Sequence, residues 1–156
     1  MRKANYDKFP STKLTGMLVQ GWDSIISMLK EKMDARKVLA VDLYTGVYEE
    51  EVLDAFSKEF SGRVMNVRDL MKPEKEIQTL TERFMTEDVL FGYVTNLKLE
   101  DYLDADKVAA ARKQISEAKD AIVIIGTGAS VVAPQDAMVV YADMARWEIQ
   151  QRFRRH

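Results

Sequence analysis

Two glycines and two hydroxyl residues follow the most apolar run of the sequence. The segment Gly126-Thr127-Gly128-Ala129-Ser130 comes directly after residues 121–125, a run typical of a strand buried on both faces. Glycines allow backbone N–H groups to converge on an anion, and ligands of α/β sheets bind at the ends of strands. The candidates for binding a phosphate or another anion are therefore Gly126, Thr127, Gly128 and Ser130. A tight turn that needs positive φ is the alternative, since the third glycine of the dinucleotide fingerprint is missing.

A second candidate loop, residues 42–48, follows the apolar run 38–41 and precedes a predicted helix. A phosphate-binding P-loop at this place would need two glycines, a lysine for the phosphate charge and a Ser or Thr for magnesium. Only Gly46 is present, no lysine follows, and the helix begins with three glutamates, which would repel a triphosphate. We therefore do not expect ordinary nucleotide binding here. Asp42 is a candidate ligand-binding residue because it lies at the carboxyl end of a predicted strand.

Two further sites place charged residues near predicted element ends. Arg68 and Asp69 follow a predicted strand at 63–67, where Asp69 could act as a general base beside an anion partner. A surface ion pair of little energetic weight is the alternative. In the C-terminal helix, Glu148 and Arg152 form a favourable i,i+4 pair and the terminal arginines suit the helix dipole. A phosphate-contacting role for Arg152 stays open.

Strands and helices alternate along the chain. Apolar stripes predict helices over 17–33, 48–60, 73–84, 104–119 and 142–154, with Ile77, Leu80 and Phe84 facing inward in the third. Strands are predicted over 38–41, 63–67, 121–125 and 137–141, and residues 89–93 form either a short strand or a loop. This alternation predicts one α/β domain over residues 1–156, with a three-layer parallel sheet covered on both faces.

Composition excludes several classes of protein. The net charge of −2 gives no global reason to bind nucleic acid or an anionic membrane. The sequence has no cysteine and its single histidine is His156, so the usual zinc sites cannot form, although a carboxylate-only magnesium site stays open. No apolar h-region follows the charged N-terminal residues, so we expect no secretory signal, and the longest apolar run is too short to span a bilayer. We expect a cytoplasmic protein.

The order of these features is similar to the core of P-loop kinases of the uridine kinase type. The shared features are a strand, loop and helix, the Arg68-Asp69 corner, an apolar strand ending in glycine, and a strand that leads into an arginine-bearing helix. The resemblance implies that Asp69 corresponds to a catalytic aspartate. It also implies phosphate contacts from arginines of the last helix, namely Arg146, Arg152, Arg154 and Arg155. Because residues 42–48 depart from the P-loop, the expected fold is P-loop-kinase-like with a degenerate phosphate loop.

Four local phrases resemble the N-terminal part of bacterial proteins labelled class I mannose-6-phosphate isomerase-like. They are residues 2–10 (RKANYDKFP), 20–22 (QGW), 126–130 (GTGAS) and 141–150 (YADMARWEIQ). In that family a kinase-like domain precedes a cupin domain, whose histidines and carboxylates hold the catalytic metal. The resemblance implies that this chain is the N-terminal part of a longer protein. It implies no catalytic residue, metal or cofactor in this chain, and a downstream cupin domain as partner.

Three functions are compatible with these features. The first is a non-catalytic or regulatory module of a mannose-6-phosphate isomerase-like protein, which senses a sugar phosphate or nucleotide at residues 126–130. The second is a small phosphotransferase with an unconventional phosphate loop and Asp69 as base. The third is a structural interaction domain whose C-terminal helix docks on a partner through Trp147 and Phe153.

Overall fold

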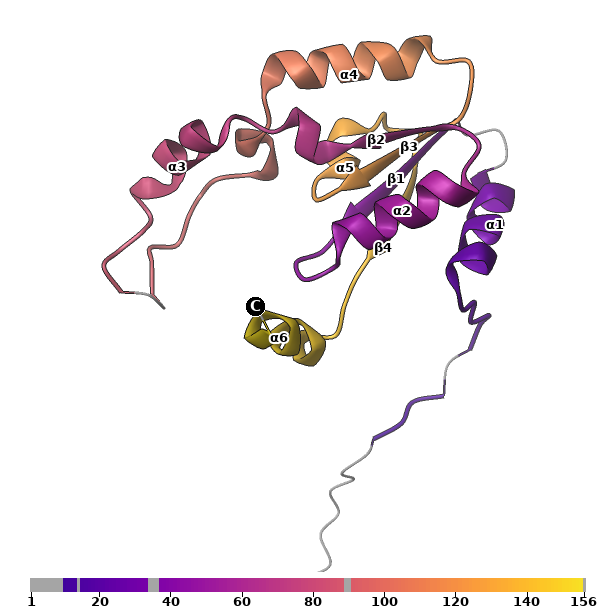
Figure 1. Cartoon of the computed structure of the whole chain (residues 1–156), viewed down its shortest axis with the longest axis horizontal. Coiled ribbons are helices and arrows are strands. Elements are labelled where there is room, and N and C mark those ends of the chain that lie inside the picture. Colours follow the sequence, from indigo (N-terminus) through magenta and orange to yellow (C-terminus); the bar gives the residue numbers. More distant parts are fainter. Residues whose placement is uncertain (1–9, 14, 34–36, 89–90, 156) are drawn as a thin grey trace, which may run out of the picture.

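The computed structural model describes residues 10–13, 15–33, 37–88 and 91–155 (Figure 1). Four strands form one parallel sheet in the order β2-β3-β1-β4. They are β1 (Val38–Leu43), β2 (Arg63–Asn66), β3 (Ile122–Gly126) and β4 (Met138–Ala142). The central strands β1 and β3 are buried along their whole length, as their continuous apolar runs predict. The predicted α/β class with a parallel sheet is confirmed.

Helices pack on both faces of the sheet (Figure 1). α1 (Trp22–Met33) and α2 (Glu49–Glu59) cover one face, where they meet Leu39 and Val41 of β1. The other face is covered by the 3-10 helix η1 (Val67–Leu70), by α4 (Ala105–Glu117) and by the one-turn helix α5 (Ala129–Val132). Since successive side chains of a strand point to opposite faces, Val38 and Ala40 join this second core.

The loops that follow β1 and β3 lead to opposite faces of the sheet. The chain leaves β1 toward α2 on one face and leaves the neighbouring strand β3 toward α5 on the other face. Adjacent strands whose outgoing loops diverge in this way form a topological switch point, where α/β sheets commonly bind ligands. The two loops predicted from sequence, residues 42–48 and 126–130, both begin at this point.

α3 (Glu74–Glu82) and the 3-10 helix η2 (Leu99–Tyr102) lie beside the sheet rather than on it (Figure 1). The predicted inward face of α3 is only half buried at Ile77, Leu80 and Phe84, because the helix projects away from the sheet and has no buried residue. Residues 91–93 are irregular and exposed, so they form no strand, while residues 89–90 lie outside the described residues.

Two predicted helix starts were too early. The first helix begins at Trp22 rather than at residue 17, because Gly21 takes a positive φ of 87° and its carbonyl accepts the N–H of Ile25. The last helix, α6 (Arg146–Arg155), does not continue directly from β4. Residues 143–145 intervene, and the side chain of Asp143 accepts the N–H of Met144 at 2.7 Å, which turns the chain between strand and helix.

Candidate functional site

The carboxylate of Asp42 lies at the switch point, at the end of β1. The residue is 9% exposed, and it is the one buried charged residue within the described part of the chain. It pairs in register with Gly126, the last residue of β3. Its Oδ1 accepts the Gly128 N–H at 2.9 Å, and its Oδ2 accepts the Ser130 N–H at 3.0 Å together with the Ser130 hydroxyl.

The loop after β3 needs its glycines to reach this carboxylate. Gly126 has a φ of 137°, and a Cβ there would lie 2.8 Å from the Cβ of Val67. Gly128 takes the left-handed conformation, with a φ of 85°. The Thr127 hydroxyl donates to the carbonyl of Leu43 at 3.0 Å, which holds the loop to the end of β1. The loop therefore has the positive φ values that a tight turn needs.

The anion in this loop is therefore supplied by the protein itself. Backbone N–H groups at the start of α5 point toward negative charge, as they would toward a phosphate. Here the Asp42 carboxylate accepts charge-assisted hydrogen bonds from two of these N–H groups and from the Ser130 hydroxyl. An external anion would have to displace Asp42, and the displaced carboxylate would stand next to it with the same sign of charge.

Five of the seven predicted site residues come together at this point: Asp42, Gly126, Thr127, Gly128 and Ser130. The other two lie elsewhere. Asp69 is exposed in η1, and no hydrogen bond or ion pair joins it to another described residue. The expected pairing of Arg68 with Asp69 does not form, because the Arg68 Nε lies 3.3 Å from Glu49 Oε1 instead.

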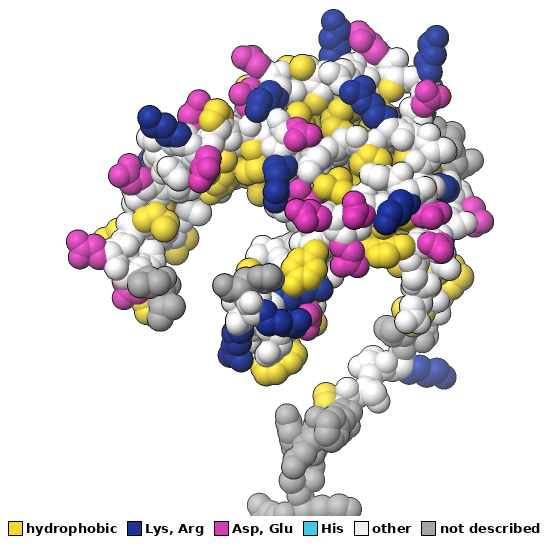
Figure 2. Space-filling view, in the orientation of Figure 1, with side chains coloured by type: hydrophobic (Ala, Val, Ile, Leu, Met, Phe, Trp, Pro, Cys, Tyr) yellow, Lys and Arg dark blue, Asp and Glu magenta, His cyan; other side chains and the backbone are white. Residues whose placement is uncertain are grey.

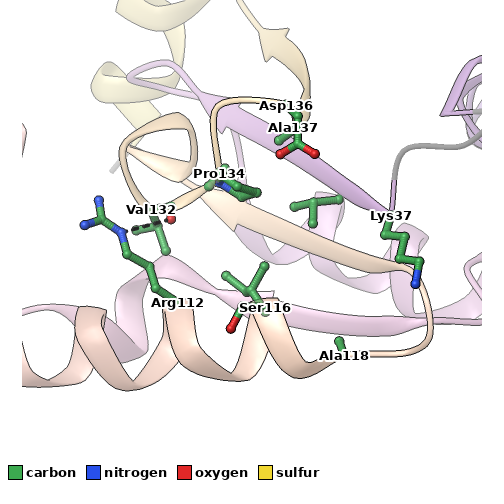
Figure 3. A pocket seen from close by; sticks show the side chains of 11 residues that line it. Lys37, Arg112, Ser116, Ala118, Val132, Pro134, Asp136 and Ala137 are labelled. Atoms are coloured by element: carbon green, nitrogen blue, oxygen red, sulfur yellow. Dashed lines mark hydrogen bonds between the residues drawn. The ribbon is translucent and has the colours of Figure 1, made fainter.

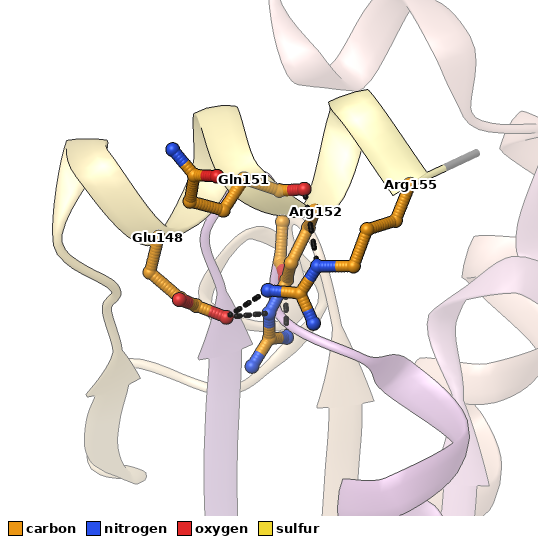
Figure 4. Close-up of polar contacts among 5 residues, drawn as sticks. Glu148, Gln151, Arg152 and Arg155 are labelled. Atoms are coloured by element: carbon orange, nitrogen blue, oxygen red, sulfur yellow. Dashed lines mark hydrogen bonds and ion pairs between the residues drawn. The ribbon is translucent and has the colours of Figure 1, made fainter.

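Arg152 fastens α6 to the loop between β1 and α2 (Figure 4). Its side chain is 18% exposed, and it donates to the Gly46 carbonyl at 2.7 Å. The predicted pair with Glu148 is confirmed at 3.2 Å, and the guanidinium lies 3.9 Å from the centre of the Tyr48 ring. Gly46 has a φ of 91°, and a Cβ there would meet Ile149 Cγ1 at 3.0 Å. α6 therefore lies directly on this loop.

Sequence reasoning missed a second polar contact at the carboxyl ends of the strands. Glu49 begins α2, and its Oε1 accepts the side-chain amide of Asn66 at 2.9 Å as well as contacting Arg68. The Asn66 Oδ1 in turn accepts the Arg68 N–H at 2.8 Å and caps η1. An asparagine at the end of a strand was the signal that a capping contact was present.

Two tyrosines stand beside Asp42 on the β4 side. Tyr141 pairs in register with Asp42, and its ring centre lies 6.1 Å from that of Tyr44. Partial desolvation of the phenol raises the pKa of Tyr141 above its ordinary value, with smaller contributions from Asp143, Tyr44 and Asp42. Tyr141 is therefore a neutral hydroxyl at physiological pH and adds no charge to the site.

Neither a metal centre nor a membrane span is found in the described ranges 10–13, 15–33, 37–88 and 91–155. Within them, no group of three or more His, Cys, Asp or Glu side chains is placed to hold a metal ion. No helix in the same ranges is long and apolar enough to cross a membrane.

Residues 21–156 match the family model described as a domain of unknown function, DUF8485. No curated protein matches the chain, and no solved structure matches it. Because the family model covers most of the sequence, including the loops at the switch point, the chain belongs to the DUF8485 family.

Proposed function

We propose that this domain is a non-catalytic module of a mannose-6-phosphate isomerase-like protein of sugar-phosphate metabolism, and that it acts by docking on another domain. The observation that supports the non-catalytic part is the contact of Asp42 with the amides of Gly128 and Ser130. The amides that would bind a phosphate already hold a carboxylate. The connection to the isomerase-like family rests on the four sequence phrases.

The fold is proposed to be a degenerate relative of the P-loop kinases. Support comes from the parallel sheet and from the place of residues 44–48, which join the first strand to a helix as a phosphate loop would. That loop has a single glycine, and the carbonyl of Gly46 accepts a hydrogen bond from Arg152. By the resemblance to the kinase family, Arg152 corresponds to an arginine that contacts phosphate. Here it contacts Gly46, Glu148 and Tyr48 instead.

Docking is favoured by exposed apolar side chains on two elements. α6 exposes Trp147 by 68% and Phe153 by 63%, although Arg152 and Ile149 hold the helix to the domain. The segment between α3 and η2 exposes Val94 by 98% and also exposes Phe91 and Tyr93. Figure 2 shows hydrophobic side chains on both elements, on either side of a hollow in the surface. Large exposed apolar side chains of this kind are candidates for an interaction surface.

The mass of the native polypeptide is the first test of this proposal. A mass well above the 17.9 kDa of this chain is expected, because the partner domain would be part of the same polypeptide. A native protein of 17.9 kDa would refute the proposed place in an isomerase-like protein.

Variants of the native polypeptide then separate docking from catalysis. Trp147→Ala is expected to weaken the contact between domains, so that the domains unfold in separate thermal transitions, while the matched control Lys119→Ala leaves unfolding unchanged. Asp69→Asn is expected to leave isomerase activity on mannose 6-phosphate unaltered. ADP formation from Mg²⁺–ATP that is lost in Asp69→Asn would establish the phosphotransferase alternative and overturn the proposal.

A further inference from the structure

A pocket of about 580 Å³ lies at the opposite end of the sheet from Asp42, between α4 and the segment that joins α5 to β4 (Figure 3). Val38 of β1 and Val132 of α5 line it, and Ile115 of α4 forms one wall. Pro134 and Ala137 line the connection to β4. A volume of this size falls in the range of small-molecule sites, which span roughly 300–1,000 Å³.

The pocket exists because α5 is only one turn long. α5 ends at Val132, and Pro134 cannot extend it because proline lacks the N–H that a helix needs. The sheet next to α5 is therefore left without a long helix on this face. Val139 of β4 pairs with the buried Ala40 on the same face, yet it is 55% exposed. The opening is thus a consequence of the fold and not of one side-chain rotamer.

Charged groups line this apolar space with an excess of one positive charge. Two cations, Lys37 and Arg112, are opposed by one carboxylate, that of Asp136. The guanidinium of Arg112 is held in place, since it donates to the carbonyls of Val131 at 2.8 Å and Val132 at 3.4 Å. The Lys37 carbonyl accepts the N–H of Ile122 at 2.8 Å, whereas no hydrogen bond or ion pair joins its ammonium to a residue that the structure describes. The ammonium can therefore pair with a ligand.

We propose that this pocket binds a small carboxylic acid with an apolar body. Its carboxylate pairs with Lys37, and its body lies against Val38, Ile115 and Val132. Apolar walls with a few placed polar groups are the usual composition of such sites. The site is remote from the loop that Asp42 fills, and the inference does not depend on the proposed function.

Octanoate, 1-octanol and octylammonium are matched probes, because they share one alkyl chain and differ in charge. Each is titrated into the ¹⁵N-labelled full chain while the amide resonances are followed. Octanoate is expected to shift the amides of Val38, Val132 and Ala137 with saturation, and to bind several-fold more tightly than octylammonium. Lys37→Gln is expected to weaken octanoate binding by about threefold, the size of a partly exposed ion pair, and to leave 1-octanol binding unchanged. Lys119→Gln, another exposed lysine outside this pocket, is the matched control.

A second variant tests the apolar body of the ligand. Ala133→Leu adds bulk where the backbone is extended, with a φ of −63°, and it is expected to weaken both octanoate and 1-octanol by more than tenfold. A dispersed amide spectrum shows that this variant is folded, and Lys37→Gln tests the charge without touching the core. The proposal is overturned if octanoate causes no saturable shift at these amides. It is equally overturned if octylammonium binds as tightly as octanoate.

Discussion

Replacing Asp42 by asparagine removes the charge from the switch point while keeping the size of the side chain. The asparagine has one acceptor oxygen, so it can accept from Gly128 or from Ser130, and its NH₂ group then faces the other donors. Hydrogen bonds to charged groups contribute about 1.5–3 kcal/mol each, and a buried donor left without an acceptor costs about 1–3 kcal/mol. Because the contacts share one carboxylate and are not additive, we expect Asp42→Asn to lower the free energy of unfolding by about 2–4 kcal/mol.

Urea unfolding of the full chain measures this loss. With a slope of about 2 kcal/mol per molar urea, the midpoint is expected to fall by about 1–2 M. Ser130→Ala removes the hydroxyl donor and keeps both amides satisfied, so we expect it to cost only about 1 kcal/mol. Asp69→Asn is the matched control, because this exposed aspartate should change stability by less than about 0.5 kcal/mol. If Asp42→Asn unfolds at the same urea concentration as Asp69→Asn, the carboxylate is not the anion that stabilises the loop.

Two further perturbations test the surroundings of the site. Arg152→Ala should destabilise the chain by about 1–3 kcal/mol, because it removes the hydrogen bond to Gly46 and the packing on Tyr48; urea unfolding and the hydrogen exchange of α6 amides measure this. The exposed neighbour Arg154→Ala should cost less than about 0.5 kcal/mol, and equal effects of the two variants would refute the role given to Arg152. The pKa of Tyr141 is higher in the folded than in the unfolded chain, so its stabilising effect is complete below the ordinary value of 10.0 and is lost as the pH rises above it. Tyr141→Phe should therefore lose less stability than the wild type between about pH 9 and pH 11, and identical losses would contradict the raised pKa.

The central strands could be predicted from local apolar runs, and the parallel pairing could be predicted from the alternation of strands and helices along the chain. Residues 38–41 and 121–125 are apolar without interruption, which is typical of a strand covered on both faces. The start of α1 was predicted too early, because the positive φ of Gly21 lies directly before Trp22, where the helix begins. The prediction that one face of α3 is buried was wrong for a different reason. Its apolar spacing is real, but the sheet does not extend beneath it.

The candidate site was predicted in its residues but not in its chemistry. The loop at 126–130 was a candidate for either a ligand site or a tight turn, and Asp42 was a candidate ligand-binding residue; in the structure they bind one another. No local pattern shows this, because the contact joins residues 86 positions apart through the adjacency of β1 and β3. Arg152 is a similar case. Its pair with Glu148 follows from helical spacing, whereas its contact with Gly46 depends on where α6 packs.

The central claim is that Asp42 fills the anion-binding amides at the end of β3. Titration of the ¹⁵N-labelled wild-type chain with inorganic phosphate tests it most directly, with the amide resonances of Gly128 and Ser130 as the reporters and that of Gly62 as an internal reference. The claim predicts that neither reporter shifts relative to Gly62 at millimolar phosphate. A saturable shift of both reporters would mean that phosphate displaces the carboxylate, and it would contradict the account.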